Sequence, residues 1–144
     1  MPETQTYQNH VRWYPLVHFV VFPLLLINLI WQIVRLYQEP SWDRTEGVVL
    51  AVALAILAFT ARIQALKAQD RVIRLEERLR YENVLSPETS GRCSDLGTGQ
   101  MIALRFARDE ELQGLVDRVL AGELKTSKEI KLAIKNWRGD YLRV

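Results

Sequence analysis

The sequence predicts an all-α membrane protein: a two-helix transmembrane hairpin whose second helix extends into the cytoplasm, followed by a small helical C-terminal module. Three observations lead to this fold class. Two long apolar segments lie in the first half of the chain, helix-forming residues follow the second segment without a break, and short amphipathic segments fill the last third. Apolar residues make up 49% of the 144 residues and gather in those two segments, which argues against one ordinary globular core.

The first apolar segment, residues 16–35, is long enough to cross a bilayer as a helix. No side chain between Arg12 and Arg35 carries a permanent charge, and about 20 helical residues cross the hydrocarbon core. A soluble protein would have to surround this helix on every side, which so short a chain cannot do. Pro23 removes one backbone hydrogen bond and predicts a modest kink.

Residues 47–66 form the second predicted span, although the uninterrupted apolar run ends at Ala61. The span reaches the required length only if the chain stays at membrane depth past Arg62, whose long apolar stem lets its charged head reach the interface. Aromatic residues bracket both spans, as they do in the interfacial belts of membrane proteins. Trp13 and Tyr14 mark one membrane face, and Trp31, Tyr37 and Trp42 mark the other.

The distribution of basic residues predicts the orientation of the hairpin. Six basic side chains lie between Arg62 and Arg80, whereas the loop 37–46 has only Arg44 against three acidic residues. The positive-inside rule therefore places the tail in the cytoplasm. Two spans return the N-terminus to the same side, and no positively charged leader or cleavage site of a signal peptide is recognisable.

Each predicted span has one distinctive face. Polar groups on the first helix are expected to hydrogen-bond the second helix or a neighbouring subunit, or alternatively to line a water-filled path. Small residues on the second helix allow a close approach by the first helix or by another copy of the chain. The polar membrane stripe consists of His18, Asn28, Gln32 and Arg35, and the helix-packing stripe consists of Gly47, Ala51, Ala55, Ala58 and Arg62.

The second span is predicted to continue as one helix through residues 67–83, because strong helix formers follow Ala61 without glycine or proline. Apolar residues there keep the alternating spacing of three and four that is typical of a coiled-coil seam. Two heptads do not establish a coiled coil, and packing against the chain's own tail explains the spacing equally well. The seam comprises Ala65, Ala68, Val72, Leu75 and Leu79.

A linker and three short helices are predicted in the rest of the tail. Glycines and Pro87 make residues 84–99 a linker, with a short helical turn beginning at Ser86. Capping residues and glycines delimit helices over about 101–107, 109–121 and 127–139. The predicted organisation is an interfacial segment 1–14, a transmembrane hairpin 15–66, an extension 67–83, a linker 84–99 and a C-terminal module 100–144.

The last two predicted helices have opposite charge. The acidic helix precedes a helix with a basic face, which we interpret either as a solvated face that attracts the acidic helix or as a contact for anionic lipid headgroups. Nucleic-acid binding is not expected, because no recognition fold accompanies these residues. The basic face consists of Lys128, Lys131, Lys135 and Arg138.

The sequence offers no recognisable catalytic or metal site. Cys93 is the single cysteine and cannot form an internal disulfide or a zinc cluster. His10 and His18 are eight residues apart, which in a helix places them about 12 Å apart, too far to share one metal. Catalytic-triad, zincin, CxxC and phosphate-loop patterns are not recognisable. We therefore expect no enzymatic activity, no metal and no cofactor.

Five stretches of the chain are distinctive in wording: NHVRWYPLVHF, AQDRVIRLEERLR, TGQMIALRFA, DEEL and EIKLAIKNWRGDYLRV. Together they resemble an uncharacterised family of small bacterial two-span membrane proteins, classed as a domain of unknown function. Relatives often have histidine where this chain has Tyr14, which weakens a metal role for the region between His10 and His18. The resemblance covers nearly the whole chain and implies a multi-pass protein of the bacterial inner (cytoplasmic) membrane, with no activity attached.

These observations favour a non-enzymatic inner-membrane protein, serving as an assembly, scaffold or regulatory subunit that presents a helical tail. Its expected partners are the lipid bilayer and either further copies of itself, as a homo-oligomer, or another membrane subunit. A small homo-oligomeric channel is the alternative, because two spans with a polar stripe are parts that such channels use. A haem or redox subunit, with one histidine from each of two copies, is a more remote alternative.

Overall fold

The computed structural model describes residues 5–10 and 13–141. Within these ranges the chain is helical and contains no strand, and an isolated antiparallel bridge pairs Ala107 with Trp137. The all-helical prediction is therefore confirmed for the described residues. The chain divides into two compact units between Leu66 and Lys67. We call residues 13–66 the hairpin unit, and residues 5–10 together with the chain from Lys67 onward the module unit.

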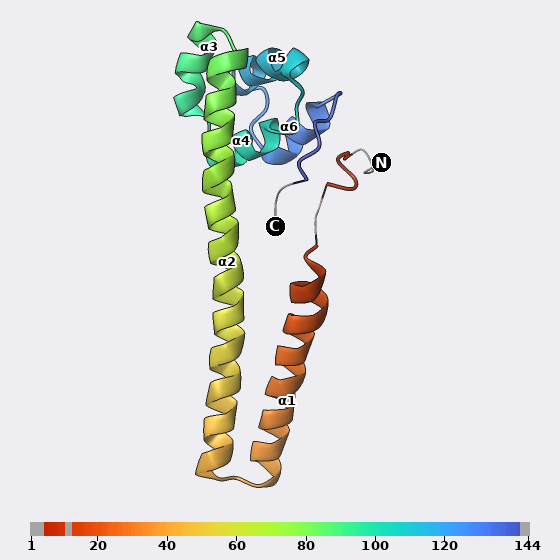
Figure 1. Cartoon of the computed structure of the whole chain (residues 1–144), viewed down its shortest axis with the longest axis vertical. Coiled ribbons are helices and arrows are strands. Elements are labelled where there is room, and N and C mark those ends of the chain that lie inside the picture. Colours follow the sequence, from red (N-terminus) through yellow and green to blue (C-terminus); the bar gives the residue numbers. More distant parts are fainter. Residues whose placement is uncertain (1–4, 11–12, 142–144) are drawn as a thin grey trace. The chain divides into compact units, whose positions relative to one another are not determined.

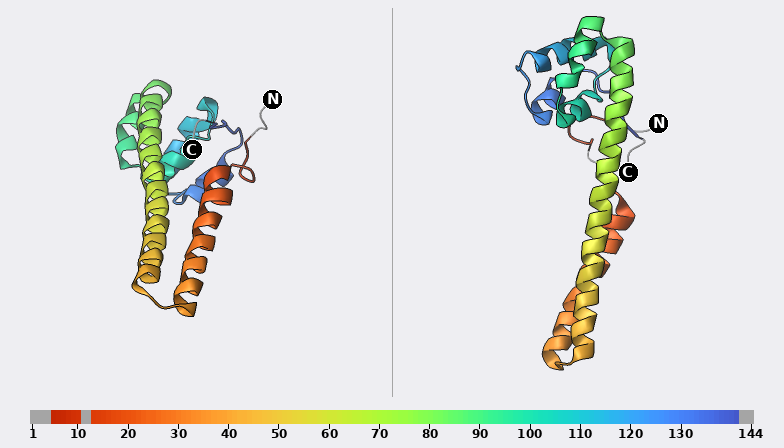
Figure 2. Two further views of the ribbon diagram at one scale, coloured as in Figure 1. Left: turned by 60° about the horizontal axis from the view of Figure 1, so that its bottom comes forward. Right: turned by 90° about the vertical axis from the view of Figure 1, so that its left-hand side faces the viewer.

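The hairpin unit consists of two antiparallel helices joined by a short turn. A π-helical segment η1 (Leu16–Val21) leads directly into α1 (Phe22–Gln38), and α2 (Trp42–Val84) returns beside it. The views in Figure 1 and Figure 2 both show the two helices of this unit side by side. Pro23 lies in the first turn of α1, where the backbone changes from π to α hydrogen bonding.

The two helices are long and apolar enough to cross a membrane. Their apolar windows are 0% buried in Leu16–Gln38 and 6% buried in Trp42–Val84. The core helix of a soluble protein would instead have its apolar side chains covered by protein. Large side chains such as Phe19, Ile27 and Leu57 lie on the surface of the unit.

Helix α2 continues without a break from Trp42 to Val84, as its composition predicts. The linker that follows is more structured than predicted, since it contains α3 (Pro87–Arg92) and η2 (Cys93–Asp95). The predicted turn at Ser86 is present, because the Ser86 hydroxyl accepts a hydrogen bond from the backbone N–H of Thr89 at 3.3 Å.

The remaining helices of the module unit are α4 (Thr98–Leu104), α5 (Asp109–Leu120) and α6 (Ser127–Ala133). Figure 1 shows α3 to α6 gathered around the last turns of α2. Gly122, with φ of 79°, ends the α5 region as the sequence predicts. The hydrophobic core draws its side chains from α2, η2, α4, α5, α6 and the segments between them, whereas α3 contributes the buried polar residue Thr89. The largest fully buried side chains of the core are Tyr81, Met101, Leu104, Phe106, Leu112, Val116 and Ile130.

The last helix was predicted to stop near Gly139, and this prediction is wrong because α6 ends at Ala133. The Glu111 carboxylate accepts hydrogen bonds from the backbone N–H groups of Lys135 and Asn136, at 3.1 and 3.0 Å. The chain then pairs with the segment after α4, where Arg138 N–H donates to the Phe106 carbonyl at 2.7 Å. These bonds replace the ones that a longer helix would have made.

Candidate functional site

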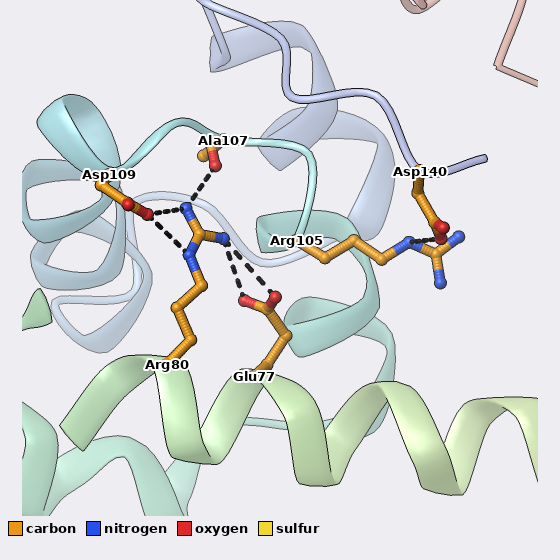
Figure 3. A network of polar contacts seen from close by, with 6 residues as sticks. All are labelled: Glu77, Arg80, Arg105, Ala107, Asp109 and Asp140. Carbon is orange, nitrogen blue, oxygen red and sulfur yellow. Dashed lines mark hydrogen bonds and ion pairs between the residues drawn. The ribbon is translucent and has the colours of Figure 1, made fainter. Parts of the chain in front are cut away.

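The most distinctive feature of the module unit is a group of charged side chains between α2 and the segments that follow α4. We call Glu77, Arg80, Arg105, Asp109 and Asp140 the charge cluster (Figure 3). Glu77 and Arg105 are two of the three buried polar or charged residues in the described chain. Buried ions are retained only when opposite charges and hydrogen bonds compensate them.

Arg80 joins three segments of the module unit. Its Nε donates to Oδ1 of Asp109 at 2.8 Å, and its Nη2 donates to the Ala107 carbonyl at 2.6 Å. Its Nη1 lies 3.3 Å from Oε2 of Glu77, one turn earlier on α2. As Figure 3 shows, one guanidinium thereby ties α2 both to the start of α5 and to the backbone before it.

The second pair of the charge cluster is formed by Arg105 and Asp140. The Nε of the buried Arg105 lies 3.2 Å from Oδ2 of Asp140, and its guanidinium carbon lies 4.6 Å from the centroid of the Phe106 ring. This pair fastens the C-terminal segment to the end of α4.

A half-open recess of about 700 Å³ lies beside the charge cluster. Its walls contain both signs of charge, so each buried ion of the cluster has an opposite charge nearby. Charge compensation of this kind is typical of a structural ion network as well as of an active site. The lining residues are Ile73, Glu76, Glu77, Arg80, Arg105, Asp109, Arg138, Gly139, Asp140 and Tyr141.

Burial has the largest effect on the pKa of Glu77 and on that of its neighbour Tyr81. Burial raises the pKa of Glu77, although the positive charges of Arg80 and Arg138 act in the opposite direction. Burial and the neighbouring Glu77 carboxylate also raise the pKa of Tyr81, so its phenol stays protonated. Within the described ranges, no three histidine, cysteine or acidic side chains come together as metal ligands. The ion pairs of the charge cluster join α2 to the start of α5, and the end of α4 to the C-terminal segment.

The N-terminal residues 5–10 pack against the C-terminal segments of the module unit. The Gln5 side chain donates to the Asp140 carbonyl at 3.1 Å and accepts from its N–H at 2.9 Å. Nε2 of His10 lies 3.0 Å from Nζ of Lys131. The His10 ring also lies 5.8 Å from the rings of both Phe106 and Trp137. We call these contacts the N-terminal clasp.

The N-terminal clasp differs from the predicted organisation, in which residues 1–14 form one interfacial segment. Of that segment, residues 1–4, 11 and 12 lie outside the described residues. The two histidines have separate surroundings, since Nδ1 of His18 lies 2.9 Å from the Tyr14 carbonyl within the hairpin unit. The structure thus gives each histidine contacts within its own unit.

Within the hairpin unit, the two predicted stripes lie on the faces that are at least partly covered. All four residues of the polar membrane stripe are half-buried, as are four of the five residues of the helix-packing stripe. Ala51 is 1% exposed, and a Cβ added at Gly47 would lie 3.0 Å from Oε1 of Gln32. The first helix therefore occupies the narrow part of the helix-packing stripe.

Ala51→Leu is expected to destabilise the hairpin unit by about 1–3 kcal/mol, because three extra carbon atoms have no space at a fully covered position. Thermal unfolding in lipid bicelles measures the effect. The same change at Ala55, which is half-buried, should cost less, and Leu57→Ala on the exposed surface should change little. A midpoint for Ala51→Leu equal to that of Leu57→Ala would contradict this packing.

The coiled-coil seam and the buried face of α2 turn out to be different faces. Ile73, Glu77 and Tyr81 are buried in the module unit, whereas Val72 and Leu75 are exposed. The chain's own tail therefore packs on α2 through residues outside the predicted seam. Ile73, Glu77 and Tyr81 are spaced by four residues, as positions on one face of a helix are. A glutamate in the middle of this set is typical of an exposed face, so the sequence pattern did not indicate that the face is buried.

The predicted basic face is not a single face, because α6 ends before two of its members. Lys131 lies over the Phe106 ring, with 5.6 Å from Nζ to the centroid, and takes part in the N-terminal clasp. Lys128 is exposed on α6, whereas Lys135 and Arg138 are exposed on the segment beyond it. The four side chains therefore have separate surroundings.

Cys93 is a free, buried thiol whose Sγ lies 3.3 Å from the Thr89 carbonyl. Burial raises the pKa of this thiol, and the negative charge of Asp117 adds to the effect. Since the thiolate is the reactive form, Cys93 is expected to be unreactive while the module unit is folded.

Comparison with known proteins agrees with the family resemblance in the sequence. A model of a family of unknown function, DUF6526, matches residues 1–144. The chain belongs to this family. No curated protein and no solved structure matches the chain. Membership confirms the resemblance to an uncharacterised domain and assigns no activity.

Proposed function

We propose that this chain is a non-enzymatic membrane protein of the bacterial inner membrane, acting as an assembly, scaffold or regulatory subunit. The observation that carries the proposal is the exposure of two apolar helices, whose apolar windows are 0% and 6% buried. Such surfaces are unfavourable in water and favourable in lipid, where a helix satisfies its own backbone hydrogen bonds. The module unit would then be the part presented to partners.

The charge distribution and the N-terminal clasp support the proposed sidedness. Six basic residues between Arg62 and Arg80 favour a cytoplasmic location for the module unit. The contact of Gln5 with Asp140 supports placing residues 5–10 on that same side. An even number of spans between these two segments agrees with both arguments.

The contacts of the polar groups within each unit support a scaffold role. Buried charges in the charge cluster are compensated by one another. The polar membrane stripe is partly covered, and Gln32 approaches Gly47 within the hairpin unit. Lys128, Lys135 and Arg138 are exposed and available to anionic headgroups.

Cysteine labelling in intact cells tests this proposal. A cysteine introduced at exposed Ser41, in the turn of the hairpin unit, should react with a membrane-impermeant thiol reagent. A cysteine at exposed Ser94 should react only after permeabilisation. The unaltered chain is the control, because its buried Cys93 should remain unlabelled in both conditions. Labelling of position 94 in intact cells would refute the sidedness, and loss of the chain from the membrane fraction would refute insertion.

A further inference from the structure

Helix α2 has a second apolar face that the module unit leaves uncovered. Val72, Leu75 and Leu79 are 54%, 61% and 55% exposed, and their spacing of three and four is that of a coiled-coil seam. The buried residues Ile73 and Glu77 lie on the other side of the helix, since 100° per residue separates them widely from the seam. In the described chain, the module unit covers one face and leaves the other exposed.

We propose that this seam pairs with the same seam of a second copy, forming a parallel two-stranded coiled coil. The inference rests on the proposed function, because two copies inserted in the same orientation present their α2 helices in parallel. The residue types fit this partner. A β-branched residue at heptad position a with leucine at d favours two strands, and Val72 and Leu75 occupy these positions.

The charges beside the seam are complementary in the parallel arrangement. With Val72 at position a, Arg71 stands at g and Glu76 at e, and both side chains are exposed. In a parallel pair, a g residue faces the e residue five positions later on the other helix. Arg71 of each copy therefore faces Glu76 of the other, giving two ion pairs by symmetry. An antiparallel pair would bring the arginines at g, Arg71 and Arg78, opposite each other.

Anchoring in the membrane explains why a seam of only two heptads is sufficient for two copies to pair. Two heptads are marginal for a soluble peptide, but confinement of both copies to one bilayer raises their effective concentration. The helix-packing stripe is a poorer contact for a second copy, because Ala51 is already covered inside the hairpin unit. The seam is the apolar face of α2 beyond the spans that both copies can share.

Crosslinking in native membranes tests the pairing. The full chain with Leu75→Cys should give a disulfide-linked dimer on mild oxidation, because d positions of a parallel pair face each other. Leu132→Cys is the matched control, since Leu132 is a leucine on α6 with 59% exposure, and it should not give this dimer. Absence of a dimer from Leu75→Cys, or a crosslink to a protein of another mass, would overturn the proposal.

A charge exchange tests the parallel register. In the Leu75→Cys chain, Arg71→Glu turns two attractions into repulsions and should lower the dimer yield about tenfold. Adding Glu76→Arg restores opposite charges and should restore the yield. A double exchange that stays low overturns the register. Only chains recovered in the membrane fraction are scored, so failed pairing is distinguished from failed insertion.

Discussion

Arg80→Met is expected to lower the free energy of unfolding of the module unit by about 3–5 kcal/mol, because it removes the ion-pair partner of the buried Glu77 carboxylate. Methionine retains much of the apolar volume of the arginine stem. The lost free energy of unfolding is therefore due to removal of the positive charge and not to a cavity. The Ala107 carbonyl also loses the donor that lies 2.6 Å away in the native protein. Removing one partner of a buried pair costs more stability than the intact pair contributes, because the other partner stays desolvated.

The buried thiol of Cys93 offers a measurement confined to the module unit. Cys93 is the single cysteine of the chain, so a thiol reagent reacts only when this unit opens. Comparing the reaction rate of the full chain in detergent micelles with that of the denatured chain gives the free energy of opening. Arg118→Met is the matched control, because Arg118 pairs with Glu123 at an exposed site. It should cost less than about 1 kcal/mol.

The same comparison has an expected pH dependence. Burial raises the pKa of Glu77 in the folded protein, so its stabilising contribution is fully present below its pKa in the unfolded chain. That contribution is lost as the pH rises through the folded-state pKa. Arg80→Met removes a cation that opposes this shift, so the stability difference from the unaltered chain should widen toward neutral pH. Adding Glu77→Gln should abolish the widening. A difference that is independent of pH would contradict the role assigned to Glu77.

The helices of the hairpin unit and the continuity of α2 could be predicted because local patterns determine them. An apolar length and the lack of glycine and proline after Ala61 are visible in any short window of the sequence. The end of α6 could not be predicted in this way. Glu111, which is 24 residues before Lys135, supplies the carboxylate that receives the backbone N–H groups there. A local pattern cannot reveal such a partner.

The charge cluster and the N-terminal clasp were missed for the same physical reason. Arg80 and Asp109 are 29 residues apart, and Gln5 and Asp140 are 135 residues apart. A single arginine or glutamate on an amphipathic helix is typical of a solvated face, so burial of Glu77 required knowledge of what packs on it. The exposed seam was more conspicuous in the sequence than the buried face, since it contains only apolar residues.

Phe106→Ala is expected to destabilise the module unit by about 3–5 kcal/mol and to release the N-terminal clasp. The Phe106 ring is fully buried and lies 5.1 Å from the ring of Trp137 and 5.8 Å from that of His10. Truncation leaves a cavity at the point where the N-terminal residues, α6 and the C-terminal segment meet. Reaction of the Cys93 thiol should therefore accelerate, and amide exchange at residues 7–10 should increase.

Two companion variants separate the core from the clasp. His10→Ala removes aromatic contacts worth about 1 kcal/mol at the edge of the module unit, so exchange at residues 7–10 should increase while Cys93 stays protected. Leu132→Ala, at an exposed position on α6, should change neither measurement. If Phe106→Ala accelerated the Cys93 reaction without affecting exchange at residues 7–10, the N-terminal residues would be held independently of this ring. Equal effects of His10→Ala and Phe106→Ala on Cys93 would instead make the N-terminal residues an integral part of the core.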